Sequence, residues 1–310
     1  MRKIIGIGAL IAAVVAGVAF LAQREDDQTA EASHHVSSED DSAPHGAKPS
    51  SRVAQNQGKS SISSILNSSE TKELALRELL PEAEKGRAQY ILAVNEILSG
   101  CELLYMPTEQ GIDRIVPAAV RSEEAWKRRY AERGKFCGNR TDLDARAEKL
   151  VANMQERMNV LASQGDRVAQ MYDAMADAGG RLSASDAKIA VNILKDAAAD
   201  SESVRRAAHA LVSSDSESIR QVDGEIFGGA YSPEDRATIK SPAAQAYACA
   251  RGAYCGPSAT FQMDNCLLTG ACDVLVPFNE YVRKYSLSGA DYKLMQLYVE
   301  RIATFARDTR

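Results

Sequence analysis

The sequence predicts an all-α protein, with antiparallel helix pairs arranged in an irregular, degenerate helical-repeat array behind an N-terminal membrane segment. Apolar residues recur at helical spacing from residue 68 onward, and they lie between residues that favour helix starts and helix ends. The composition agrees, because alanine is abundant and aromatic residues make up only 6% of the chain. No stretch of alternating β-branched residues indicates a strand.

The membrane segment is the first element. The chain carries no charge from Ile4 to Ala22, and Arg2 and Lys3 precede this stretch. A bilayer takes about 20 apolar residues, whereas the core of a signal peptide has about 7 to 15. We therefore expect residues 1–22 to be a signal-anchor that crosses the bacterial inner membrane once, with the C-terminal body in the periplasm. A cleaved signal peptide, which leaves a soluble periplasmic protein, is the alternative.

Residues 23–67 follow as a predicted disordered acidic tether. They are rich in Ser, Asp, Glu and Gln and nearly free of large apolar residues, so they cannot bury enough surface to offset their ordering entropy. As a random coil the tether would span about 35 Å. We interpret His34, His35 and His45 as solvated linker residues rather than metal ligands. The helical domain is then residues 68–310.

Local motifs predict where the helices of this domain begin and end. Pro81 is expected to break the first helical run. Helix starts are predicted at Thr141 with Asp144, Ser183, Ser232 before Pro233, Ser241 before Pro242, and Ser288 with Asp291. Helix ends are predicted at Gly100, Gly134, Gly179, Gly180, Gly252 and Gly270.

Six cysteines lie in this domain, and we expect all of them to form disulfides. An even number of cysteines in an oxidising compartment is typical of a disulfide framework. A zinc site favours C-x2-4-C pairs and a thioredoxin-type site needs C-x-x-C, so no metal or redox cofactor is expected from the C-x5-C spacing. The six are Cys101, Cys137, Cys249, Cys255, Cys266 and Cys272.

Local pairing is the predicted connectivity. Each C-x5-C contains a glycine that is suited to ending a helix, so the chain can turn back within six residues. This predicts Cys249–Cys255 and Cys266–Cys272, and leaves Cys101–Cys137 by elimination. A nested alternative, with Cys255–Cys266 inside Cys249–Cys272, stays open because it would tie two helices of a hairpin together.

A faint repeat runs through the domain. An Ala-Gln pair begins at Ala88, Ala169 and Ala244, and Ala-x-x-Gly precedes the first two pairs. This pattern resembles SEL-like repeats, which are relatives of tetratricopeptide repeats, over three short stretches within residues 68–270. The resemblance implies a scaffold or partner-binding role, and local disulfides that staple helix pairs. The C-terminal third also resembles helical envelope proteins of Gram-negative bacteria that have no established activity.

Residues suited to catalysis are scarce in the predicted domain. His209 is its only histidine, and its flanking alanines favour helix packing. Ser185 and Lys188 fit S-x-x-K, but neither S-D-N nor K-T-G follows. Residues 121–136 carry both signs of charge around Trp126 and Tyr130. They indicate a solvated amphipathic helix, with a binding face for an anionic partner as the alternative.

The predicted function is therefore a non-catalytic, membrane-tethered scaffold or protein-interaction module whose partner is an envelope protein. The net charge of −5 does not favour nucleic acid. A cell-envelope enzyme on an unfamiliar helical fold, for example one acting on peptidoglycan, is the alternative. A cleft with a buried Asp/Glu pair would favour the enzyme, whereas an apolar or aromatic groove would favour the interaction module.

Overall fold

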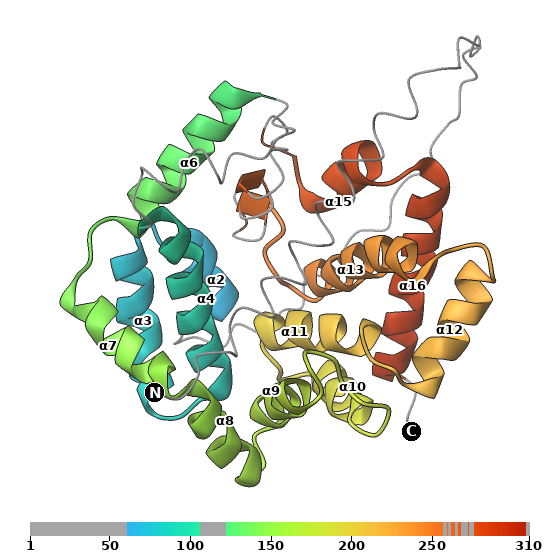
Figure 1. Cartoon of the computed structure of the whole chain (residues 1–310), viewed down its shortest axis with the longest axis horizontal. Coiled ribbons are helices and arrows are strands. Elements are labelled where there is room, and N and C mark those ends of the chain that lie inside the picture. The colour runs from blue at the N-terminus through green and yellow to red at the C-terminus, as the bar shows by residue number, and fades with distance from the viewer. Residues whose placement is uncertain are drawn as a thin grey trace. The chain divides into compact units, whose positions relative to one another are not determined.

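The computed structural model describes residues 61–105, 122–256, 259, 262–263, 266–267, 272 and 276–307. Over these residues the chain forms helices and no strand, which confirms the all-α prediction (Figure 1). The apolar segment 4–22 and residues 23–60 of the predicted tether lie outside the described residues. Within the described part of the chain, no helix combines the length and the apolar character that a bilayer-spanning segment needs.

Thirteen α-helices and one π-helical turn make up the described residues. In chain order they are α2 (Ile62–Ser68), α3 (Lys72–Glu84), α4 (Ala88–Tyr105), α6 (Glu123–Cys137), α7 (Asp142–Ala152), α8 (Met154–Ser163), α9 (Arg167–Asp177), α10 (Ala187–Lys195), α11 (Ser201–Val212), α12 (Glu217–Phe227), α13 (Pro233–Ala250), α15 (Phe278–Tyr281), η2 (Val282–Ser286) and α16 (Gly289–Arg307).

The helical body begins earlier than the sequence predicts. Helix α2 starts at Ile62, inside the stretch that we assigned to the tether, and Ser61 caps it by accepting a hydrogen bond from the Ser64 amide. Ile62 and Ile65 are buried, and α2 packs against α3, α4 and α11. The predicted boundary at residue 68 is therefore too late. The segment before it has few apolar residues among its serines, and these are buried only because helices distant in sequence cover them.

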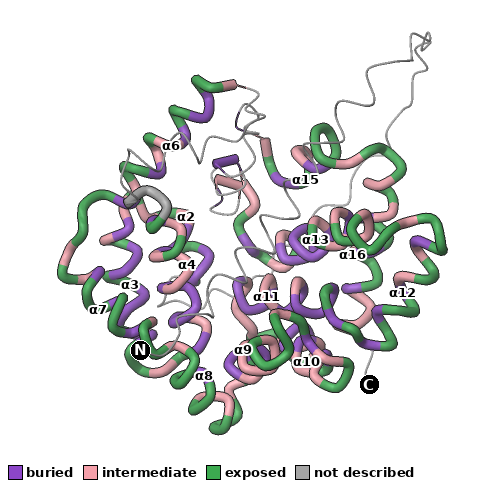
Figure 2. The backbone as a smooth tube through the Cα atoms, in the orientation of Figure 1, coloured by how far each residue is buried: buried purple, intermediate pink, exposed green. Residues whose placement is uncertain are grey.

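One extended hydrophobic cluster, which we call the main core, joins most of these helices. Helix α3 packs on α4 and α7, while α11 packs on α10 and α13, and α16 packs on α10, α12 and α13. The buried residues face between the helices (Figure 2). Small residues such as Ala207, Ala210 and Ala244 let neighbouring helices approach closely.

Several predicted helix starts are confirmed. Thr141 and Asp144 form a capping box at α7, and Ser232 caps α13 just before Pro233. Ser288 accepts a hydrogen bond from the Asp291 amide at the start of α16. The helix predicted to start at Ser183 begins four residues later. Ser183 accepts from the Asp186 amide in a turn, and α10 begins at Ala187.

Both prolines that were expected to mark helix boundaries lie inside helices. Pro81 lies in α3 and Pro242 lies in α13. A proline in a helix interior removes one hydrogen bond and costs about 3 kcal/mol. The predictions were wrong because neighbouring residues, such as Leu80 and Ala243, are buried in the main core and hold each helix together.

Two of the predicted glycine ends are also wrong. Gly100 lies inside α4 and Gly134 inside α6. At Gly100 the cause is packing, because a Cβ would lie 2.0 Å from Nη2 of Arg133 on the crossing helix α6. The ends at Gly179, Gly180 and Gly252 are confirmed, each with a positive φ. Gly270 lies outside the described residues.

The three predicted disulfides are confirmed, and the nested alternative is wrong. Their Cα–Cα distances are 5.6 Å for Cys101–Cys137, 5.7 Å for Cys249–Cys255 and 4.7 Å for Cys266–Cys272. We expected Cys101 to follow a helix end, but it lies inside α4, and only Cys137 is the last residue of its helix.

A second, smaller hydrophobic cluster lies beside α6, and we call it the satellite core. It consists of Ala125, Trp126, Cys266, Leu267 and Cys272. The Trp126 indole Nε1 donates a hydrogen bond of 3.2 Å to the Leu267 carbonyl oxygen. Because Trp126 is only 2% exposed, it docks α6 and cannot form part of the surface face considered for residues 121–136.

Candidate functional site

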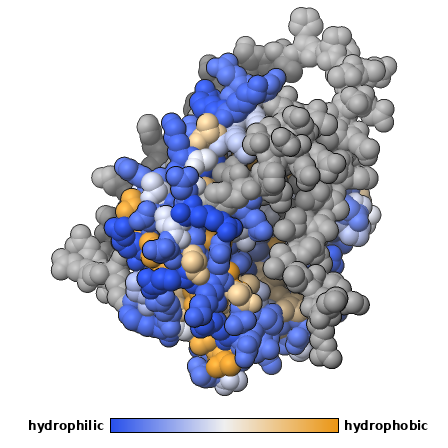
Figure 3. All heavy atoms as spheres, turned by 60° about the vertical axis from the view of Figure 1, so that its left-hand side comes forward, coloured by the Kyte–Doolittle hydropathy of each residue, from blue (hydrophilic) through white to orange (hydrophobic). Residues whose placement is uncertain are grey.

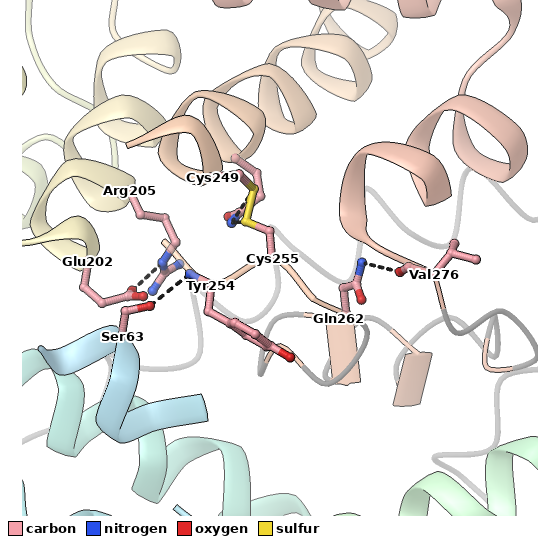
Figure 4. The surroundings of a disulfide bond; sticks show 9 residues. Ser63, Glu202, Arg205, Cys249, Tyr254, Cys255, Gln262 and Val276 are labelled. Carbon is pink, nitrogen blue, oxygen red and sulfur yellow. Dashed lines mark hydrogen bonds and ion pairs between the residues drawn. A yellow bond between two sulfur atoms is a disulfide. The ribbon is translucent and has the colours of Figure 1, made fainter. Parts of the chain in front are cut away.

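A polar cleft opens where α2, α4, α11 and α13 meet the loop between Cys249 and Cys255. It is small and partly open to solvent. Figure 4 shows the loop, its disulfide and the neighbouring side chains. The cleft is lined by Leu66, Asn67, Glu96, Glu202, Arg205, Gln245 and Tyr254.

Ion pairs between α4 and α11 form one wall of this cleft. Nη2 of Arg205 lies 3.1 Å from Oε1 and 2.9 Å from Oε2 of Glu96, and Nη2 of Arg206 lies 2.5 Å from Oε2. Nε of Arg205 also donates to Oε2 of Glu202 at 2.6 Å. Arg205 therefore bridges two carboxylates that come from different helices, which fixes the wall in one geometry.

These charges keep the Glu96 carboxyl ionised. Burial acts to raise its pKa, but the charges and hydrogen bonds of Arg205 and Arg206 outweigh burial and lower the pKa overall. Two acids and two bases, with Glu202 as the second acid, give the wall no net charge. His209 lies deeper on α11, and burial followed by the charge of Arg205 lowers its pKa to about 4. It is neutral near pH 7.

Gln245 lines the cleft and contacts both His209 and the disulfide. Its carboxamide is hydrogen-bonded to His209, and its Nε2 donates to Sγ of Cys255 at 3.6 Å and to Sγ of Cys249 at 4.0 Å. Gln245 itself is buried. The partly buried histidine and the disulfide are therefore linked through Gln245, while Arg205 acts on His209 through its charge.

Tyr254 is the last residue of the disulfide loop, next to Cys255. Its backbone amide donates a 3.0 Å hydrogen bond to Oγ of Ser63 on α2, so the loop is held against the first helix. The ring extends away from the disulfide and is 41% exposed (Figure 4). A Cβ on Gly256 would lie 2.4 Å from the Tyr254 hydroxyl, so the ring lies over a position where only glycine fits without a shift.

Asn67 on α2 lines this cleft and contains a buried acceptor without a donor. Nδ2 of Asn67 donates to the Ser63 carbonyl oxygen at 2.6 Å. Oδ1 of Asn67 is buried and has no hydrogen-bond donor among the described residues. Leaving such an acceptor unpaired costs about 1 to 3 kcal/mol. The cleft therefore offers the Tyr254 ring beside a wall whose charges balance.

The two glutamates are the feature that would favour an enzyme, since they are paired acids in one cleft. Cleavage by a carboxylate pair needs one member protonated, with a raised pKa. The pKa of Glu96 is lowered instead, and Arg205 bridges the pair. This arrangement is suited to holding helices and binding a polar group, and it supplies no general acid at Glu96.

The other residues considered for chemistry lie elsewhere. Ser185 and Lys188 are exposed, in the turn before α10 and in its first turn, and neither lines the cleft. No group of three or more His, Cys, Asp or Glu side chains in the described ranges could hold a metal ion.

The sequence analysis did not single out the residues of the cleft. Asn67, Glu96, Arg205 and Tyr254 come from three helices and one loop, and none belongs to a motif. The sequence offers one weak signal, which is that an aromatic residue, Tyr254, lies inside a C-x5-C that also contains Gly252.

Comparisons with family models, with curated proteins and with solved structures find no match to this chain. The resemblance to SEL-like repeats therefore remains a hypothesis that rests on the residues alone.

Proposed function

We propose that the chain is a membrane-tethered periplasmic scaffold that binds an envelope protein through the polar cleft. The observation that carries this proposal is the exposed Tyr254 ring, held by a disulfide loop beside a rigid, charge-balanced wall. An aromatic side chain with few rotatable bonds gives large contact area at low entropic cost, and such residues are enriched in binding hot spots.

The repeat hypothesis is supported by two similar local structures. Gly86 between α3 and α4 has a φ of 80°, and Gly165 between α8 and α9 has a φ of 93°. In both cases the helices on either side pack together, and the following Ala88 and Ala169 are fully buried. The third copy differs, because Ala244 lies within the continuous helix α13. Two copies that form similar helix pairs, followed by a third that does not, agree with a degenerate helical repeat.

The compartment is inferred from the cysteines and the N-terminal segment together. All six cysteines are paired, and disulfides of this kind persist in oxidising compartments. The uncharged stretch 4–22 would export the body and, if it is not cleaved, anchor it in the inner membrane.

A surface outside the cleft provides a control position. Figure 3 shows the face around α3, α7 and α8, where most described side chains are hydrophilic and the hydrophobic ones form small groups. Val160 on α8 is 51% exposed, so it resembles Tyr254 in accessibility and lies outside the cleft.

Site-specific photo-crosslinking in intact cells tests the proposal. A benzophenone amino acid at position 254 of the full-length chain should give a discrete crosslinked product, and the same group at position 160 should not. Identical products from both positions, or no product from position 254, would contradict partner binding at the cleft.

A further inference from the structure

The three disulfides differ in how far they are open to solvent. Cys101 and Cys137 are buried, as are Cys266 and Cys272. Both sulfurs of Cys249–Cys255 belong to residues that are only partly buried, at the rim of the main core. Thiol–disulfide exchange requires the attacking thiolate to reach a sulfur atom, so accessibility separates this bond from the other two.

The surroundings of Cys249–Cys255 also determine which of its two sulfur atoms is the better leaving group. The amide of Gln245 donates to Sγ of Cys255 at 3.6 Å and lies farther, at 4.0 Å, from Sγ of Cys249. A hydrogen-bond donor stabilises a thiolate, and a lower leaving-group pKa speeds exchange. Cys249 lies in the last turn of α13, where the helix dipole disfavours a negative charge. Both effects make Cys255 the better leaving group.

The loop that this bond closes anchors two distant helices. The Tyr254 amide donates to Ser63 of α2, and the Cys255 carbonyl oxygen accepts a 3.0 Å hydrogen bond from the Phe278 amide at the start of α15. Opening the disulfide frees the loop between residues 249 and 255, so both anchors lose their fixed geometry. The state of this one bond is therefore linked to the position of Tyr254.

We propose that Cys249–Cys255 is a thiol–disulfide exchange site, which a dithiol reductant of the thioredoxin class opens while the other two disulfides stay closed. A thiolate of the reductant attacks Sγ of Cys249, the S–S bond breaks, and the electron pair leaves on Sγ of Cys255, which then takes a proton from solvent. The second thiol of the reductant attacks the mixed disulfide and releases Cys249 as a thiol. Two electrons and two protons pass to the cysteine pair, and the dithiol becomes a disulfide.

This inference does not rest on the proposed function, because the exchange needs no protein partner at the cleft. The first test is the order of reduction in the full-length oxidised chain. Dithiothreitol is added in steps without denaturant, free thiols are alkylated, and peptides are mapped by mass spectrometry. Cys249 and Cys255 should be alkylated at a reductant concentration at least tenfold below that needed for the other four cysteines. Earlier or simultaneous reduction of either buried disulfide would overturn the proposal.

The second test determines which of the two sulfur atoms the incoming thiolate attacks. The monothiol glutathione should be trapped as a mixed disulfide on Cys249, with the free thiol on Cys255. In Gln245→Leu, which keeps a side chain of similar size but removes the donor, exchange should slow about tenfold and the trapped product should divide more evenly between the two cysteines. A structural role for Gln245 would not by itself change which sulfur carries glutathione, so an unchanged preference for Cys249 would contradict its assignment as the donor.

The third test measures whether reduction breaks the two hydrogen bonds that anchor the loop, from the Tyr254 amide to Ser63 and from the Phe278 amide to Cys255. After selective reduction, amide hydrogen exchange should accelerate at Tyr254 and Phe278, while the amides of α6 near Cys137 stay as protected as before. Cys249→Ser with Cys255→Ser should reproduce this pattern without reductant. Unchanged exchange at Tyr254 and Phe278 in both cases would show that the bond does not hold the anchors.

Discussion

The main core and the satellite core are stabilised in different ways. The main core buries apolar residues from α2 through α16, and disulfide Cys249–Cys255 lies at its rim. The satellite core has five buried residues, and two of them are the cysteines of its own disulfide. Burial contributes about 25 cal/mol per Å² of apolar surface, so a cluster of this size offsets little of the entropy of ordering its loops.

The comparison shows that the satellite core depends on covalent bonds where apolar burial is insufficient. Helix α6 is held by Cys101–Cys137 at one end and by Trp126 against Leu267 near the other. The paired helices of the main core, such as α11 and α13, need no bond between them because their buried faces are large. Small structural units that lack a sizeable core generally depend on such crosslinks.

The largest effect should come from removing a buried leucine in the main core. Leu211 on α11 is fully buried, so Leu211→Ala should lower the free energy of unfolding by about 3 to 4 kcal/mol and weaken the whole domain. Urea unfolding followed by circular dichroism measures this loss.

The same change at Leu267 in the satellite core should lower the free energy of unfolding less and leave the unfolding transition of the main core unchanged. Leu297→Ala, at a residue 48% exposed, should change the midpoint very little. Equal losses at Leu211 and Leu267 would remove the distinction between the two cores.

Removing the Cys101–Cys137 disulfide tests whether α6 and the satellite core depend on covalent bonds for their stability. Cys101→Ser with Cys137→Ser opens a loop with a sequence separation of 36, and the chain-entropy estimate for such a loop is about 3.8 kcal/mol, as an upper bound. We expect most of this loss to appear as local release of α6. Amide exchange should accelerate in α6, and Trp126 fluorescence should shift toward that of an exposed indole. Lys127→Ala, on the exposed face of α6, is the control. Loss of protection in α11 to the same extent would show that the cores unfold together.

Acid should weaken the main core through His209. Its pKa is lowered by burial and by the charge of Arg205 from 6.5 to about 4, so between these values the unfolded chain binds more protons than the folded chain. The contribution is fully present above about pH 6.5 and is lost as the pH falls toward 4, by up to about 3 kcal/mol. Urea titrations at several pH values should show this slope, and His209→Gln should flatten it. The satellite core contains no histidine, so its response to pH should not change in that variant. A slope that persists in His209→Gln would assign the acid sensitivity to other groups.

Much of the secondary structure was predictable because its causes are local. The capping box of Thr141 and Asp144 and the proline after Ser232 act within one helical turn, so the sequence alone locates these starts. The local disulfides could be predicted for a similar reason, because Gly252 turns the chain back within a short loop. The candidate site could not be predicted in this way. Asn67, Glu96 and Arg205 are distant in sequence, and no spacing rule relates them.

The sequence by itself determined that the described chain is helical, because helical periodicity depends on neighbouring residues. It favoured local closure of each C-x5-C, and the structure decided against the nested alternative. Only the tertiary structure decided that Pro81 and Gly100 lie within helices and that α2 belongs to the body. A proline or a glycine costs a helix about 1 to 3 kcal/mol, and burial of the same turn against other helices contributes a comparable amount. The balance at each such position depends on residues far away in the chain, as does the place of Tyr254 beside Ser63.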